Sequence, residues 1–390
     1  MGDGEALFLV LSLLYLSDCL LWVRKRSVAF VSPWCRRWRV ANANPLFGNE
    51  RGGLLFLNPL PPLGHVFLSD PSPVSVSPVG VCTFDRQPRF FPGRVTPRAR
   101  SLTFAEITRS STDSAFLLIN NRKFAKCATT KQAKAISELI NATIDAAPSA
   151  REGLIYRHIT KQFAVDEAAS ILRNAFDVIK PIQFTCCIFF LFLFVATPIL
   201  VSTLGLLRLI VPVAAVIIVF ATQISIMFYR GHKELYPHDK QERIESVIKM
   251  VLCPPVSIRT TDLLTKHLLS EYSPVVLGTL FPDAAAQRFV RSYILDLQHP
   301  LADEARDETS AAIISWAATT HLSLCIAHIS RPGVLQPEVL TPPAQDGNSI
   351  SYCPRCRCQY VVRSGQCPDC PGVGLLAFPD PSETDVGGAL

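Results

Sequence analysis

The residues of this chain best suited to chemistry are cysteines near its C-terminus. Two Cys-x-x-Cys pairs, ten residues apart, are formed by Cys353, Cys356, Cys367 and Cys370. Two thiolates of one such turn can reach the same ion, and two turns complete the tetrahedral shell that Zn²⁺ prefers. Because four cysteine ligands leave no open position, we expect structural zinc rather than metal catalysis. A disulfide pair, a redox dithiol and an iron–sulfur site remain alternatives.

The segment between the two pairs must bring them together. Gln359–Arg363, followed by Ser364-Gly365, reads as a short strand and a turn. About 20 residues here resemble the zinc-ribbon family with rubredoxin-like knuckles, whose pattern is C-P-x-C-G-x-x-aromatic followed by C-P-x-C-G. The matching residues are Cys353, Pro354, Cys356, Tyr360, Cys367, Pro368 and Cys370. Arg357 and Pro371 stand where glycine is usual, and Cys358 is an extra thiol that could compete as a ligand.

The composition of the chain indicates a membrane protein. The mean hydropathy of +0.27, with 49% hydrophobic and only 18% charged residues, is too apolar for an ordinary soluble chain of 390 residues. The excess lies in three blocks. They predict a transmembrane helix over residues 6–23 and a transmembrane hairpin of two helices over residues 184–229.

The first block is just long enough to cross a hydrocarbon core of about 30 Å. Acidic residues precede it and Arg24-Lys25-Arg26 follow it, the reverse of a signal peptide. The positive-inside rule therefore places the N-terminus outside. Asp18 is either an intramembrane functional carboxylate or a residue at the cytoplasmic end that reaches headgroups or pairs with the basic cluster. The second interpretation is favoured.

Basic residues also flank the hairpin. Lys180 precedes it, and Arg230, His232 and Lys233 follow it, so both outer flanks belong in the cytoplasm. We therefore expect an integral protein of the plasma (inner) membrane with three spans, its N-terminus outside and its C-terminus cytoplasmic. Cytoplasmic thiols stay reduced, which agrees with the zinc assignment.

The remaining sequence predicts an α+β multi-domain protein. Residues 40–147 combine short apolar runs with Pro and Gly, which indicates a small cytoplasmic β-rich domain. Asn120-Asn121 is a tight-hairpin signal, and Thr129 or Thr130 can cap a closing helix.

Helical patterns surround the hairpin. Residues 151–180 predict an amphipathic stalk helix, and residues 239–330 predict an all-α cytoplasmic domain in which Asp283 and Asp303 act as N-caps. The C-terminal part is then divided into a Pro-rich linker over 331–350, a zinc ribbon over 351–374 and a flexible tail over 375–390.

Other candidate sites are weaker. His321, Cys325 and His328 share one helix face and could bind a metal, but no fourth ligand is identifiable and a packed helix interior is favoured. The basic segment Arg24–Arg39 contains two tryptophans and could bind nucleic acid. An anchor on anionic headgroups explains it better. The phosphate-loop, dinucleotide and hydrolase motifs are missing from the sequence.

Two functions follow from these features. The preferred one is an integral membrane scaffold that presents its cytoplasmic domains and zinc ribbon to a protein partner. The alternative is a membrane-anchored enzyme or regulator whose site is assembled from distant residues, with His267, Asp262, Arg259 and Glu271 as candidates.

Overall fold

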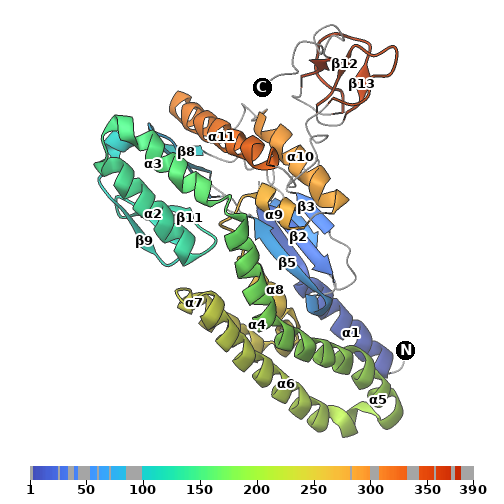
Figure 1. Ribbon diagram of the computed structural model, residues 1–390. Helices are drawn as coiled ribbons and strands as arrows, with labels where there is room; N and C mark the ends of the chain where they lie inside the picture. The colour runs from blue at the N-terminus through green and yellow to red at the C-terminus, as the bar shows by residue number, and fades with distance from the viewer. Residues whose placement is uncertain are drawn as a thin grey trace.

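The computed structural model of the protein is mixed α+β, with helices predominating (Figure 1). This agrees with the fold class predicted from the sequence at that level. The structure describes residues 3–24, 27–33, 39–42, 53–58, 61–69, 72–84, 99–281, 283–298, 307–331, 342–354, 357–369 and 374–378.

Two long antiparallel helices form the predicted hairpin. α4 (Val165–Leu191) continues through a π-helical turn, η4 (Phe192–Ala196), into α5 (Thr197–Leu204). α6 (Leu206–Leu235) then returns along them. The joint is Gly205 at φ 80°, a backbone conformation that glycine adopts without steric cost.

Length and composition mark three helical segments as able to cross a membrane. They are Pro148–Leu204, Leu207–Leu235 and Glu308–Ile329. The first two contain the predicted hairpin. Membrane association is thus supported for the part of the chain where it was predicted most strongly.

The predicted stalk helix over 151–180 is divided between two helices. α3 (Pro148–Lys161) ends where the Gln162 N–H turns back to the carbonyl of Ile159. α4 then runs from Val165 into the membrane hairpin, with Pro181 inside the helix. The second half of the stalk and the first span of the hairpin are therefore one continuous helix.

The first predicted span differs from the structure. α1 (Asp3–Asp18) ends five residues before Val23, and β1 (Leu20–Arg24) follows it, paired antiparallel with β4 (Gly53–Leu57). The prediction of a helix through Val23 is wrong, because backbone pairing with β4 captures residues 20–24. The remaining helix of 16 residues is about 24 Å long, which is shorter than the hydrocarbon core.

α1 nevertheless lies along the hairpin (Figure 1). Its Tyr15 ring packs on Phe190 and Phe194, with centroid distances of 5.5 and 5.1 Å. Near its N-terminus, Gly4 faces the Pro198 carbonyl and Ser202 of α5. α1 is therefore antiparallel to α4–α5, and its N-terminal end lies on the same side as the hairpin turn at Gly205.

The strands of the predicted 40–147 domain are divided between two cores. β2 (Val28–Pro33) lies between β3 (Arg39–Asn42) and β5 (Gly64–Ser69) in an antiparallel sheet. Its Phe30 is fully buried and packs on Phe281 and Phe289, in the same core as the membrane helices.

This sheet changes two predictions. The β-rich domain does not form one unit from residue 40, because β5 belongs to the sheet that packs with the helical region. Residues 28–31, which lie in the segment assigned to headgroup binding, are instead buried in a central strand. Trp34 and Trp38 of that segment lie outside the described residues.

A second core is formed by later strands and two helices. One sheet has the order β6-β7-β8 and the other β11-β10-β9, and α2 and α3 pack on them. The strands are β6 (Val74–Val76), β7 (Gly80–Phe84), β8 (Ala99–Thr103), β9 (Ser110–Asp113), β10 (Phe116–Ile119) and β11 (Arg122–Lys126).

Local predictions hold well within this second core. Asn120 and Asn121 have φ values of 51° and 61° and connect β10 to β11, as expected for a tight hairpin. Thr129 caps α2 (Thr130–Asp145) by accepting a hydrogen bond from the N–H of Gln132. Short 3₁₀ turns occur at η2 (Pro61–Leu63) and η3 (Phe104–Glu106).

In the region 239–330, predicted as all-α, the described residues form helices joined by turns; the longest such turn follows α8 and covers residues 266–272. The elements are α7 (Lys240–Leu252), the 3₁₀ helix η5 (Pro254–Arg259), α8 (Thr260–Thr265), α9 (Pro274–Leu280), α10 (Ala284–Gln298) and α11 (Glu308–Ile329). The N-cap of α11 is Asp307, which accepts from the Ser310 N–H at 2.6 Å; the predicted cap, Asp303, lies outside the described residues.

α11 is the third helix with a membrane-like composition. It packs against β6, β7, β8 and α10 (Figure 1). Its apolar residues thus contact the second core and the helical region, which is consistent with its prediction as part of the helical domain.

The C-terminal module is a small antiparallel sheet of order β13-β12-β14. Its strands are β12 (Ser351–Tyr352), β13 (Gln359–Tyr360) and β14 (Leu376–Ala377). The ring of Phe378 packs on Tyr352 at 5.0 Å. The ordered module therefore extends past residue 374 and into the segment predicted as a tail.

Candidate functional site

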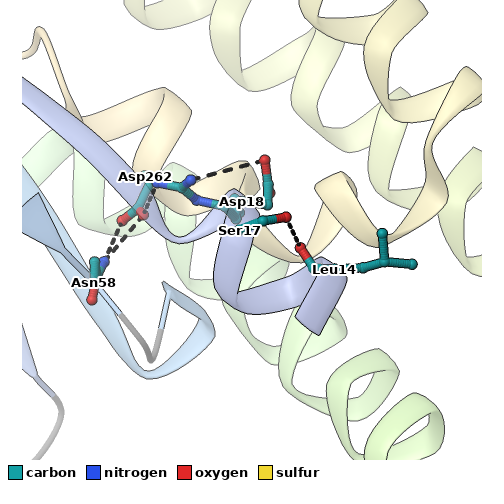
Figure 2. A network of polar contacts seen from close by, with 6 residues as sticks. Leu14, Ser17, Asp18, Asn58 and Asp262 are labelled. Carbon is teal, nitrogen blue, oxygen red and sulfur yellow. Dashed lines mark hydrogen bonds and ion pairs between the residues drawn. The ribbon is translucent and has the colours of Figure 1, made fainter. Parts of the chain in front are cut away.

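Four polar residues meet where α1 ends against η5 and α8. Asp18 is the last residue of α1, Asn58 follows β4, Arg259 ends η5, and Asp262 lies in α8. We call Asp18, Asn58, Arg259 and Asp262 the polar cluster (Figure 2). Its members come from three distant stretches of the chain.

Asn58 forms hydrogen bonds both to the residue that follows α1 and to α8. Its backbone N–H donates to the carbonyl of Cys19 at 3.1 Å. Its side-chain Nδ2 donates to both carboxylate oxygens of Asp262, at 3.2 and 3.1 Å. One residue thus fixes the position of the α1–β1 junction relative to α8.

Arg259 lies between the two carboxylates. Its Nη2 donates to Oδ2 of Asp262 at 3.2 Å, and its Nη1 is 4.0 Å from Oδ1 of Asp18. The side chains of Arg259 and Asp262 are only 10% and 4% exposed, whereas that of Asp18 is 36% exposed. The pair with Asp262 is therefore a buried hydrogen-bonded ion pair, and the pair with Asp18 is a weaker electrostatic contact.

Burial dominates the acidity of Asp262. It raises the pKa of this carboxyl from 3.8 to about 6, although the Arg259 guanidinium and the Asn58 amide favour the charged form. The carboxyl is thus mostly ionised at neutral pH and takes up a proton in mild acid. The cluster can hold α1 in place and bind a proton.

The structure adds a neighbour of Asp18 that the sequence did not predict. The sequence predicted pairing with headgroups or with Arg24-Lys25-Arg26, whose side chains lie outside the described part of the chain; the structure adds Arg259, 4.0 Å from the carboxylate. Arg259 and Asp262, named as members of a possible distant site, are brought together. Glu271 is not, since its carboxylate pairs with Lys131 at 2.8 Å. Asn58 was missed, because no local signal distinguishes it from other loop asparagines.

The His321, Cys325 and His328 face lies against other helices. Nε2 of His321 is 3.3 Å from the Ser273 hydroxyl and 3.2 Å from the Tyr293 hydroxyl. The ring of Phe163 packs on both histidines, with centroid distances of 5.2 and 5.8 Å. These are contacts of a packed helix interface, the interpretation that the sequence favoured.

Two of the four predicted zinc ligands can be placed. Cys353 and Cys367 are 0% and 2% exposed and belong to one small core with Tyr360 and Leu375. Cys356 and Cys370 lie outside the described residues. Among the described residues, no three His, Cys, Asp or Glu side chains are grouped so that they could hold a metal ion.

The surroundings of the two placed thiols fit a zinc knuckle. The Tyr360 hydroxyl is 3.1 Å from Sγ of Cys367, where it can support a thiolate. Arg357 has φ 63°, the left-handed conformation that explains the usual glycine at this position, and its N–H donates to the Cys353 carbonyl at 2.9 Å. The first thiol of each pair is thus buried in one core, and the Tyr360 hydroxyl lies beside that of Cys367.

Comparison of the chain with protein-family models, with curated proteins and with solved structures found no match.

Proposed function

We propose that this protein is an integral membrane scaffold whose C-terminal zinc ribbon recruits a protein partner to the cytoplasmic face of the plasma (inner) membrane. The observation that carries the proposal is the separate core of the C-terminal module, formed by Cys353, Cys367, Tyr360 and Leu375. A module with its own sheet and core, tethered by a Pro-rich segment, suits docking better than support of the main fold.

The membrane helices provide the anchor. Large apolar side chains of α1, α4–α5 and α6 are exposed, among them Leu13, Phe184, Leu207 and Val211 at 59%, 66%, 90% and 75%. Such a surface is stable only when lipid or protein covers it. In our proposal lipid covers it, and the N-terminus lies outside while the module lies in the cytoplasm.

Zinc binding by Cys353, Cys356, Cys367 and Cys370 would stabilise the module. The ion would supply the cross-link that so small a core needs, since a few buried side chains contribute little on their own. Its role here is structural. The Tyr360 hydroxyl would support the thiolate of Cys367 from the second coordination sphere.

The test combines metal analysis with recovery of the partner. Full-length protein purified in mild detergent is expected to carry about one zinc per chain. The Cys367→Ser, Cys370→Ser variant should lose the zinc and the co-purifying partner together. Cys358→Ser is the matched control, since it removes a neighbouring thiol outside the proposed ligand set.

Deletion of residues 345–390 separates docking from folding. Membrane insertion and melting of the remaining chain should be almost unchanged, and partner recovery should be lost. Retention of the zinc in the double variant would contradict the ligand assignment. Aggregation of the truncated chain would show instead that the module is part of the main fold.

A further inference from the structure

α7 exposes a stripe of apolar side chains outside the membrane hairpin. Ile244, Ile248, Val251 and Leu252 are 42%, 51%, 61% and 79% exposed. Their spacing places the first three on one face of the helix. The core-facing side of α7 is formed by other residues, Arg243, Ser246 and Met250, which are all buried. The stripe is therefore a second face, additional to the one that packs on the protein.

The position of α7 along the hairpin is fixed by contacts at both ends. Near its start, the Arg243 guanidinium lies 5.2 Å from the ring of Tyr229 in α6. At its end, the Met250 sulfur accepts from the Thr260 hydroxyl at 3.8 Å. α7 therefore runs back along the cytoplasmic end of α6, toward the membrane.

The C-terminal turn of α7 reaches the level where the hairpin becomes apolar. η5 follows α7 after one residue, and its Ser257 carbonyl accepts from the Cys186 thiol of α4 at 3.4 Å. Cys186 lies just inside the apolar block that begins with Phe184. Val251 and Leu252 are thus exposed close to the boundary between headgroups and acyl chains.

The stripe lies beside other exposed side chains with apolar surface. Ile226 and Tyr229 of α6, the helix that α7 packs on, are 50% and 44% exposed. α7 also carries Lys240 and Lys249 at exposed positions, which suits anionic headgroups. In the first turns of α7, the Gln241 amide donates to Glu245 at 3.0 Å and accepts from the Ser114 hydroxyl, between β9 and β10, at 3.5 Å.

We propose that α7 is an interfacial membrane helix that inserts its Ile244, Ile248, Val251 and Leu252 stripe into the cytoplasmic leaflet. The occupant of this surface is lipid. α7 was predicted as part of a cytoplasmic domain, so this inference extends the membrane contact beyond the hairpin. It rests on the hairpin crossing the bilayer, which the same experiment tests separately.

A photoreactive residue can identify what covers the stripe. p-Benzoylphenylalanine is placed at Ile248, and the full-length protein is irradiated in vesicles that contain anionic phospholipid. Lipid adducts are then counted by mass spectrometry. Ile218, 61% exposed in α6, is the positive control, and Glu138, an exposed residue of α2 in the second core, is the negative control.

We expect lipid adducts at Ile248 at a yield within about threefold of that at Ile218, and at least tenfold above that at Glu138. Lipid at Ile218 but not at Ile248, or an adduct of Ile248 with a second protein chain, would overturn the proposal. Absence of lipid at both positions would overturn the hairpin assignment as well. The same label at Ile244 provides a second position if the Ile248 variant is poorly folded.

Discussion

At the scale of single residues, one buried guanidinium balances the charge of the polar cluster. Arg259 is hydrogen-bonded to Asp262 and lies near Asp18, so its removal would leave a buried carboxylate without a cation. Breaking a buried pair in this way typically costs about 3–5 kcal/mol, whereas replacing both partners by apolar residues is often neutral. Comparing a single with a double substitution therefore separates the net contribution of the ion pair to stability from the penalty of leaving one buried charge unpaired.

The first prediction uses Arg259→Met. We expect a marked fall in the melting temperature of the detergent-solubilised protein, equivalent to about 3–5 kcal/mol. Adding Asp262→Leu should recover part of the loss, because the unpaired buried charge is then removed. Arg173→Met, at an exposed position of α4, serves as the control and should melt like the parent. A single variant as stable as the control would argue against the cluster.

The second prediction concerns the pH dependence of Asp262. Its pKa is raised to about 6 in the folded protein from 3.8, so the folded state binds the proton more tightly. The contribution of Asp262 to the free energy of unfolding is therefore largest below pH 3.8. This contribution falls by on the order of 3 kcal/mol in total as pH rises from 3.8 to 6. Above that window it is constant.

Comparison with Asp262→Asn isolates this effect. The melting temperature of the parent minus that of the variant should fall as pH rises across the window and then level off. Other carboxyl groups titrate in both proteins and cancel in the difference. A difference that is independent of pH, or that rises with pH, would show that the carboxyl is not held in the environment described.

At the scale of elements, α1 approaches the hairpin through a residue without a side chain. A Cβ atom on Gly4 would lie 2.7 Å from the Pro198 carbonyl oxygen, which is backbone and cannot rotate away. The close contact of α1 with α5 therefore depends on glycine, as is common where membrane helices pack closely.

The third prediction follows from this contact. Gly4→Val should force α1 away from α5 and lower stability by about 1–3 kcal/mol, a typical cost of overpacking. Thermal melting in detergent measures it. Gly153→Val in α3 is the matched control, since nothing lies within 4 Å of a Cβ there. Equal melting of the two variants would mean that α1 is not packed on α5 as described.

At the scale of the whole molecule, α1 and the hairpin have matching ends. Gly4 lies beside Pro198 and Ser202, so the N-terminal end of α1 is on the same side as the Gly205 turn. The polar cluster and the basic residues Lys180 and Arg230 lie at the other end. This arrangement agrees with a shared outer side for the N-terminus and the turn.

The fourth prediction is the topology itself. Reporter fusions after residues 50, 206 and 390 should read inside, outside and inside, because the basic flanks then share the cytoplasmic side. α1 is shorter than the hydrocarbon core, so the fusion after residue 50 is the most informative of the three. If it reads outside, α1 does not cross the bilayer even though it lies along the hairpin.

Features that depend on neighbouring residues could be predicted from the sequence alone. The hairpin was visible from its hydropathy, the turn at Asn120-Asn121 from residues that tolerate positive φ, and the cap at Thr129 from its hydroxyl. The resemblance to zinc knuckles rests on spacing within one short segment. Each of these signals is local, because hydrogen bonding and burial within a few residues produce it.

Only the tertiary structure decided which distant segments share a core. Residues 20–24 pair with β4 as a strand, so α1 ends at Asp18, although the apolar block of the sequence continues to Val23. Likewise, Asp18 lies 4.0 Å from Arg259, which is 241 residues away in the sequence. Backbone pairing and buried charge depend on which groups are neighbours in space, and a single sequence does not encode those distances locally.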